Sequence, residues 1–211
     1  MNPYITIRPE FPADFRQTEE LVRESFWNVY QPGCYEHFIL KHLRQSPDYL
    51  ADLSQVMELE GQLIGQITFV KGSVDLDQGG RLPVLTLGPM AIRPDYQGLG
   101  LGKKLLDSSI DLTRSLGYGC VCLEGNPDFY GQSSFVPASQ YGLRHYGVPE
   151  GEAAPFFLAL ELQPAYLAHA AGLYQVSPVY NALEGQEAAF AAYDATFPER
   201  EKQTLPGQLF S

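Results

Sequence analysis

The chain has 211 residues and carries 14 basic against 25 acidic side chains, a formal net charge of −11. Its hydrophobic fraction of 45% is ordinary for a globular chain, and its length suffices for one domain with a sizeable core. A surface of this charge repels phosphate backbones, so we expect no nucleic-acid partner and favour cationic ligands. The chain has neither an apolar run of membrane-spanning length nor an N-terminal secretory pattern, so we expect a cytoplasmic protein without a membrane partner.

The first part of the chain predicts a strand, two helices and a hairpin. Apolar residues alternate in the strand and recur at helical spacing in the helices, and QPG at 31–33 separates the two helices. A Glu-Gly pair at 60–61 lies between two strand-like runs and predicts the hairpin turn. The expected elements are a strand over 4–10, helices over 14–30 and 35–44, a hairpin over 51–70 and a polar loop over 71–80.

The second part continues an α/β pattern. It predicts a strand over 83–92, a helix over 101–116, and strands over 119–124 and 156–162. After Gln163 the chain becomes rich in Ala, Tyr, Gly and Pro, with one helix expected near 185–197. We therefore expect a core domain over 1–163 and a C-terminal extension over 164–211 that packs on or near it.

The three cysteines predict no metal site and no disulfide framework. Cys120 and Cys122 fall on one face of a predicted strand, and no histidine stands at metal-ligand spacing from them. An odd number of cysteines suits free, buried thiols in a reducing compartment.

A glycine-rich segment, QGLGLGK over residues 97–103, lies between a predicted strand and a predicted helix. Neither the dinucleotide fingerprint nor the nucleotide P-loop fits the spacing of its glycines. Alternate glycines still let backbone N–H groups approach an anion, and the helix start and Lys103 and Lys104 add positive charge. The segment therefore predicts a phosphate-binding loop, with a plain turn as the alternative.

Pro89 lies inside the preceding predicted strand, where it cannot donate a ladder hydrogen bond. A bulge at Gly88–Pro89 would resolve this conflict and release backbone groups of Met90, Ala91 and Ile92. Exposed backbone leading to an anion-binding loop suits a long ligand with an amide-bearing arm and a pyrophosphate.

The stretch LGPMAIRPDYQGLGLGKKLL resembles the acetyl-CoA-binding motif of the GNAT N-acetyltransferases, Gln/Arg-x-x-Gly-x-Gly/Ala, through Gln97, Gly100 and Gly102. Residues 4–180, with GNPDFYGQSSF among them, are similar to a bacterial branch of predicted N-acetyltransferases. The resemblance implies the GNAT fold, an α/β (α+β layered) fold. Its mixed, mostly antiparallel central sheet splays at the acetyl-CoA groove and is flanked by helices.

The resemblance also implies roles for individual residues. Met90, Ala91 and Ile92 would contact the pantetheine arm through their backbone. The pyrophosphate would be bound by Gln97, Gly98, Leu99, Gly100, Leu101, Gly102 and Lys103. Asn126 would contact the cofactor, beside an equally expected role as a helix N-cap, and Tyr130 would protonate the departing thiolate, with plain packing on the sheet as its alternative. The chain departs from the branch at Gln132, Ser133 and Ser134, where Arg-Phe-Gly is usual, which puts the acceptor in doubt.

The resulting expectation is a transferase that uses acetyl-CoA as co-substrate, without a metal, to acetylate a primary amine by direct transfer in a ternary complex. The alternative is a non-catalytic acyl-CoA-binding or regulatory module on the same fold. The charge of the chain favours a cationic small-molecule or peptide amine. We expect it between the first two helices, around Trp27, Tyr30 and Tyr35, and the hairpin over 51–70, and a homodimer stays open. No general base is assigned among Glu58, Glu60, Glu124 and the histidines.

Overall fold

The computed structural model describes residues 4–181 and 184–208. The chain forms two compact units, and each is described by itself. The first takes in Met1–Thr68, Pro89–Leu105 and Pro178–Ser211, and the second takes in Phe69–Gly88 and Leu106–Ser177.

The strands pair as a mixed, mostly antiparallel sheet flanked by helices, as the resemblance implied. Among the described residues the order is β1-β2-β3-β4-β5-β8-β6, with β9 pairing β3 and β7. The pairs β4–β5 and β7–β9 are parallel. The strands are β1 (Ile5–Pro9), β2 (Gln55–Leu59), β3 (Gln62–Leu76), β4 (Arg81–Ile92), β5 (Cys120–Glu124), β6 (Val136–Pro137), β7 (Leu143–His145), β8 (Phe157–Glu161) and β9 (Gly172–Gln175).

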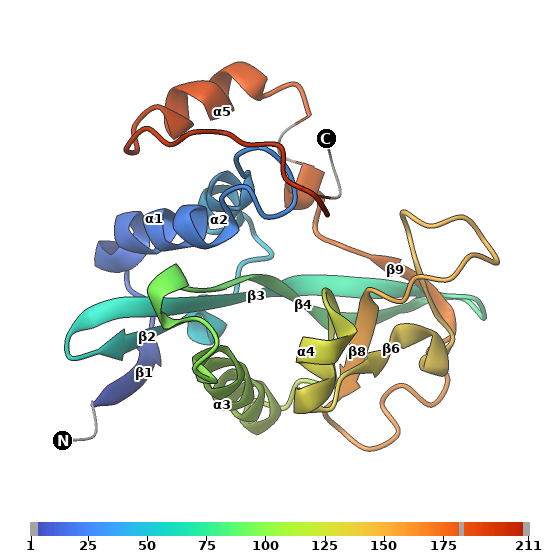
Figure 1. Cartoon of the computed structure of the whole chain (residues 1–211). Helices are drawn as coiled ribbons and strands as arrows, with labels where there is room; N and C mark the ends of the chain where they lie inside the picture. Colours follow the sequence, from blue (N-terminus) through green and yellow to red (C-terminus); the bar gives the residue numbers. More distant parts are fainter. Residues whose placement is uncertain (1–3, 182–183, 209–211) are drawn as a thin grey trace. The chain divides into compact units, whose positions relative to one another are not determined.

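Five α-helices accompany these strands within the described residues: α1 (Phe15–Phe26), α2 (Glu36–Leu43), α3 (Leu101–Ser115), α4 (Pro127–Tyr130) and α5 (Glu187–Asp194). In the first unit α1 and α2 cover one face of β2 and β3, and α5 lies on the outer side of these helices (Figure 1). Leu21 and Val22 of α1, Leu40 of α2 and Ala91 of β4 form a buried cluster there. The second unit has its own core around Cys120, Cys122 and Tyr174.

The predicted first helix is too long at its C-terminal end. It ends at Phe26 rather than Tyr30 because Trp27 is extended and Asn28 takes a left-handed backbone with φ +60°. The Asn28 side-chain oxygen accepts a hydrogen bond from the Gly33 N–H at 2.8 Å, which closes a loop where a further helical turn was expected.

The predicted hairpin is confirmed, but most of the loop predicted after it is strand. Glu60 and Gly61 have φ of +51° and +85°, the left-handed pair of a two-residue hairpin turn. The predicted loop over 71–80 is strand up to Leu76, and the chain turns only around Gly79 and Gly80. The polar residues Lys71, Ser73 and Asp75, which are exposed or half-buried, gave this part of β3 the composition of a loop.

Three short strands escaped the sequence analysis: β6, β7 and β9. β9 falls in the predicted C-terminal extension but pairs with β3, where Gln175 faces Ser73. Residues after Gln163 therefore contribute to both units, and a domain boundary at Gln163 stays a prediction.

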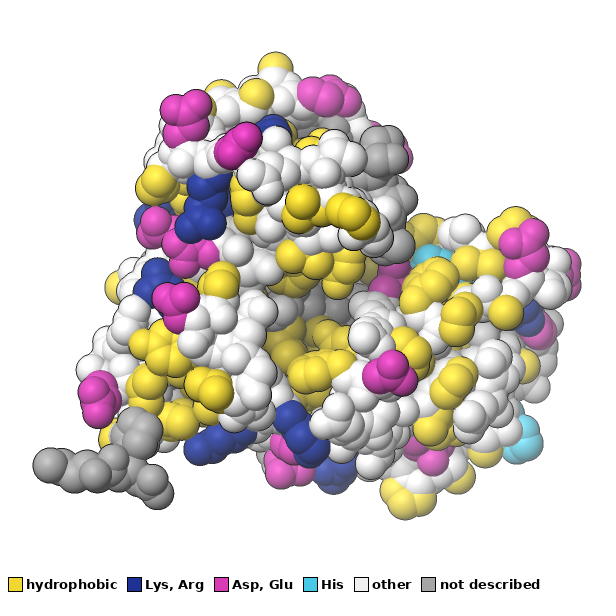
Figure 2. All heavy atoms as spheres, in the orientation of Figure 1, with side chains coloured by type: hydrophobic (Ala, Val, Ile, Leu, Met, Phe, Trp, Pro, Cys, Tyr) yellow, Lys and Arg dark blue, Asp and Glu magenta, His cyan; other side chains and the backbone are white. Residues whose placement is uncertain are grey.

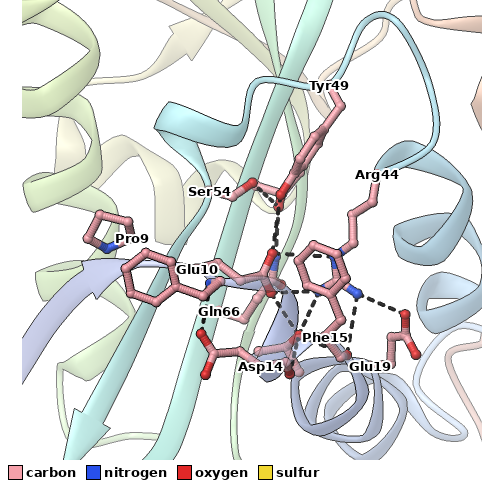
Figure 3. Close-up of polar contacts among 12 residues, drawn as sticks. Pro9, Glu10, Asp14, Phe15, Glu19, Arg44, Tyr49, Ser54 and Gln66 are labelled. Carbon is pink, nitrogen blue, oxygen red and sulfur yellow. Dashed lines mark hydrogen bonds and ion pairs between the residues drawn. The ribbon is translucent and has the colours of Figure 1, made fainter.

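A buried ionic cluster joins β1, α1 and α2 in the first unit (Figure 3). Arg44 donates to Glu10 Oε1 at 2.6 Å and to Glu19 Oε1 at 2.8 Å. Glu10 also accepts from Thr18 at 2.7 Å and from Tyr49 at 3.3 Å. The cluster fixes the entry of the chain into α1 against α2.

The C-terminal segment of the first unit is held against α1 and α2 by charged contacts. Asp194 of α5 accepts from Arg23 at 2.7 Å, and Tyr193 donates to Glu19 at 2.6 Å. Arg200 donates to Glu24 at 2.8 Å. Figure 2 shows basic and acidic side chains next to one another on this side of the unit.

Candidate functional site

The glycine-rich loop opens α3 as predicted. Gly98 and Gly100 have φ of +73° and +77°, and a Cβ at either position would meet no atom within 4 Å. The amide of Lys104 donates to the Gly100 carbonyl at 3.1 Å, so the helical hydrogen bonds start from Gly100. The first amides of α3 have no acceptor inside the helix, and the helix dipole adds positive charge at this end. The loop thus combines an anion-binding helix start with glycines that leave space above the backbone.

Gln97 ties this loop to the end of β4. Its Nε2 donates to the Ile92 carbonyl at 2.8 Å, and the Ser25 hydroxyl of α1 donates to the same oxygen at 2.9 Å. The side chain predicted to bind pyrophosphate therefore has a structural partner already, and it shapes the loop. Its contact with a ligand stays a prediction.

At the end of β4 the side chains of Ala91 and Ile92 are buried, whereas that of Met90 is half-buried. Ala91 packs in the cluster of α1 and α2, and a Cβ at Gly65 would lie 2.7 Å from Ile92 Cδ1. Backbone contact of Met90–Ile92 with a ligand stays a prediction, and the Ile92 carbonyl already accepts from Gln97 and Ser25. The strand runs unbroken through Gly88 and Pro89, so the bulge predicted there stays a prediction.

The β4–β5 ladder is short in the second unit. Within the described residues it pairs Leu85 with Val121 and Thr86 with Cys122, although β5 continues to Glu124. A parallel ladder that stops before its strands end accords with a sheet that opens at this point.

Asn126 begins α4 as its N-cap, which confirms the structural half of its prediction. Its Oδ1 accepts the Asp128 N–H at 2.8 Å, and Pro127 is the first helical residue. The cap uses the carboxamide oxygen, so a ligand contact would fall to the NH₂ group.

Tyr130 is the last residue of α4, and its ring packs against two aromatic rings and against Gly125. Its ring packs edge-on against Phe129 and Phe135 with centroids 4.9 and 5.8 Å away. A Cβ at Gly125 would lie 2.3 Å from the Tyr130 ring, so only glycine admits the ring at this place. The ring position is therefore built into the chain that links β5 to α4.

The segment that departs from the family pattern still forms an ordered turn. Gln132 donates to the Asp128 carbonyl at 3.0 Å, and Ser133 donates to Asp107 of α3 at 2.6 Å. Ser134 adopts φ +68° in the position where the family pattern has glycine. The departure keeps the turn that follows Tyr130.

The predicted site residues fall into two groups, one in each unit. Met90–Ile92 and Gln97–Lys103 belong to the first unit, whereas Asn126 and Tyr130 belong to the second. Each group keeps the local geometry described above.

The carboxylates and histidines left unassigned from the sequence differ sharply in their surroundings. Glu58 is paired with Arg8 at 2.7 Å, and Glu60 lies in the hairpin turn. His37 is buried beside Asp194. Glu124 is exposed and accepts a hydrogen bond from His145 at 2.9 Å. No local motif could have predicted this contact, because 21 residues separate the two side chains.

The aromatic residues predicted around the acceptor are largely occupied by the C-terminal segment. The Trp27 indole donates to the Glu201 carbonyl at 2.9 Å, and the Tyr35 ring packs edge-on against Phe190 at 4.7 Å. An acceptor pocket around these rings stays a prediction that these contacts disfavour.

The cysteines are buried free thiols, as expected. A hydrogen bond with Cys120 and burial raise the pKa of Cys122, which makes it a poor nucleophile. Within residues 4–181 and 184–208, no group of His, Cys, Asp and Glu could hold a metal ion. None of the helices described has both the length and the apolar character needed to cross a membrane.

Comparison with known proteins places these features in a family. The sequence model described as "Acetyltransferase (GNAT) family" matches residues 15–130. The uncharacterized N-acetyltransferase YhbS of Escherichia coli K12 is 30% identical over 138 residues, 65% of this chain and 77% of YhbS. The uncharacterized N-acetyltransferase YjhQ of the same strain is 30% identical over 54% of this chain and 65% of its own length.

Solved structures show the same fold. The crystal structure of E. coli YhbS in complex with CoA is similar with a TM-score of 0.74 and 26% identity, over 86% of this chain and 94% of YhbS. A GNAT family acetyltransferase from Brucella melitensis, in complex with acetyl-CoA, has a TM-score of 0.65 and 23% identity over 84% of this chain and 98% of its own.

Proposed function

Because this chain belongs to the GNAT family of acetyltransferases, we propose that it transfers the acetyl group of acetyl-CoA to a primary amine within a ternary complex. The observation that carries the proposal is the loop before α3, where Gly98 and Gly100 have left-handed backbones under open space. A pyrophosphate fits this loop because backbone amides and the helix dipole can neutralise it. The similar YhbS was crystallised with CoA, which supports the same ligand here.

Tyr130 is the proposed acid. The amine nitrogen attacks the thioester carbon, the C–S bond breaks, and the departing sulfur takes the phenolic proton. An ordinary phenol pKa of about 10 lies above that of a thiol near 8.5, which is close enough for rapid transfer. Direct transfer is favoured over an acetylated cysteine because Cys120 and Cys122 are both buried.

The rival function, a non-catalytic CoA-binding module, was suggested by residues 132–134. These residues form an ordered turn in which Ser133 donates to Asp107 of α3, and turnover, rather than this turn, separates the two functions.

Calorimetry with CoA tests the binding half of the proposal. Replacing Gly100 by Val forces a β-branched side chain into φ +77° and should weaken CoA binding about tenfold or more. Gly151→Val is the matched control, since Gly151 has φ +86° with no atom near its Cβ position and lies in the second unit. Undiminished affinity in Gly100→Val would remove the loop from the site.

Thiol release from acetyl-CoA over a panel of amines tests the catalytic half. We expect sequential rather than ping-pong kinetics, because no acetyl-enzyme forms. CoA binding without turnover of any amine would favour the non-catalytic module instead.

A further inference from the structure

The end of β5 carries an exposed carboxylate that a buried histidine holds. The Glu124 side chain is 48% exposed, and that of His145, at the end of β7, is 6% exposed. Their contact is 2.9 Å, between His145 Nε2 and Glu124 Oε1. Neither residue has a part in the CoA-binding loop or in the acid step proposed above.

The backbone fixes which nitrogen of His145 carries the proton. The Gly147 N–H donates to Nδ1 at 3.1 Å, so Nδ1 is an acceptor and Nε2–H donates to Glu124. Phe157 and Tyr174 enclose the imidazole, with ring centroids at 5.3 and 6.1 Å. His145 therefore orients the Glu124 carboxylate.

Two exposed aromatic rings pack against the His145 ring of this pair. Tyr146 lies 4.5 Å from the His145 ring and Phe156 lies 5.4 Å from it. They are 43% and 38% exposed, unusually open for large apolar side chains. Burial and, to a smaller extent, the charge of Glu124 raise the pKa of Tyr146. A carboxylate beside aromatic faces is a favourable site for an organic ammonium ion.

Glu124 and Tyr130 lie on opposite faces of β5. A Cβ at Gly125 would lie 3.2 Å from Leu123 and 2.3 Å from the Tyr130 ring, so Tyr130 covers the Leu123 face. Side chains alternate along a strand, so Glu124 projects from the other face, where Phe157 is its cross-strand neighbour. The carboxylate and the proposed acid therefore lie on different faces of the same strand.

We propose that Glu124, held by His145, binds the ammonium form of the acceptor between Tyr146 and Phe156 and removes its proton. This inference rests on the proposed acetyltransferase function and names its substrate class: primary amines attached to an apolar or aromatic group. Glu124 is the catalytic residue, and His145 is a positioning residue.

One ammonium proton moves to Glu124, and the freed nitrogen lone pair forms the C–N bond at the thioester carbon. The C–S electron pair leaves with sulfur, which takes the Tyr130 proton. A second nitrogen proton returns to Tyr130 through water, and Glu124 releases its proton to solvent. The products are an amide, a thiol and one proton.

The test measures acetylation of 2-phenylethylamine and of aniline by the full chain. 2-Phenylethylamine is an ammonium ion at pH 7, whereas aniline is neutral and needs no base. Glu124→Gln should lower kcat/KM for 2-phenylethylamine about 10²-fold or more and should change that for aniline far less. Glu152→Gln, which removes the same charge from an exposed turn of the same unit, should leave both rates unchanged.

Two further variants separate positioning and binding from folding. His145→Phe should raise KM and lower kcat, and His145→Gln, which keeps an N–H donor, should restore much of the loss. Tyr146→Ala should raise KM for 2-phenylethylamine about 5- to 30-fold, and Tyr146→Phe, which keeps the ring, should not.

The outcomes distinguish this inference from the function on which it rests. Equal losses for both amines in Glu124→Gln, or full activity in that variant, would overturn the inference and leave the acetyltransferase proposal standing. If neither 2-phenylethylamine nor aniline is acetylated while another class of amine is, the inference is overturned as well. Absence of turnover with every amine would end both the inference and the catalytic proposal, even where CoA still binds.

Discussion

Glu10 in the first unit and Glu124 in the second are both carboxylates held by a neighbouring side chain, but their surroundings differ. Glu10 is fully buried at its carboxylate and accepts from Arg44, Thr18 and Tyr49 (Figure 3). Glu124 is half exposed, and among the described residues its hydrogen-bond donor is His145. A carboxylate can bind a ligand only where the fold leaves some of its lone pairs without a hydrogen-bond donor. Glu10 can only stabilise the fold, whereas Glu124 retains capacity for a cation.

The largest effect should come from removing the cation of the buried ionic cluster formed by Arg44, Glu10 and Glu19. Arg44→Met leaves Glu10 and Glu19 buried without their cation, so the free energy of unfolding should fall by about 3–5 kcal/mol. Urea denaturation measures this loss, and Glu124→Gln under the same conditions should cost less than about 1 kcal/mol. Similar losses in both variants would erase the distinction between the two carboxylates.

The next effect concerns rate rather than stability. Tyr130→Phe should lower kcat about 10²-fold with CoA affinity unchanged, since only the transition state loses an interaction. Steady-state kinetics and calorimetry check this together, and denaturation should show a change within about 1 kcal/mol. An unchanged kcat where chemistry limits turnover would leave Tyr130 with a packing role alone.

The free energy of unfolding should depend on pH through the buried His37 of the first unit. Burial lowers the pKa of His37 from 6.5 to about 4, although Asp194 lies 3.1 Å from its Nε2 and opposes the shift. Below pH 6.5 the His37 imidazole binds a proton in the unfolded chain but not in the folded chain. The free energy of unfolding therefore falls as the pH falls from 6.5 towards 4.

Comparison of wild type with His37→Gln measures this contribution. Between pH 7.5 and 5.0 the wild type should lose about 2 kcal/mol more unfolding free energy than the variant. Equal losses would mean that the pKa of His37 is the same in the folded and the unfolded chain.

The smallest effect tests the turn after Tyr130. Ser134 has φ +68°, which a non-glycine residue adopts at a cost, so Ser134→Gly should stabilise the chain by about 0.5–1 kcal/mol. Gln132→Gly, two residues earlier in the same turn, should destabilise it by a similar amount because it loses its side-chain bond to Asp128. Opposite signs in denaturant midpoints are the expected result.

Local patterns in the sequence determined the glycine-rich loop, the helix that follows it and the first hairpin. Apolar spacing predicted α3, and Glu60–Gly61 predicted the hairpin, because helix periodicity and left-handed turns are decided by neighbouring residues. The glycines at 98 and 100 predicted left-handed backbone for the same reason. The resemblance of residues 87–106 then indicated the family.

Only the tertiary structure decided what the remaining polar residues do. Gln97 was assigned to the ligand, but its partner at the end of β4 became visible only once the loop was folded. β9 was missed because a four-residue strand depends on β3 and β7 beside it rather than on its own composition. Glu124 and His145 come from β5 and β7, and their contact exists only because the second unit brings these strand ends together. Contacts between residues far apart in the chain depend on strand pairing and packing, which no local spacing encodes.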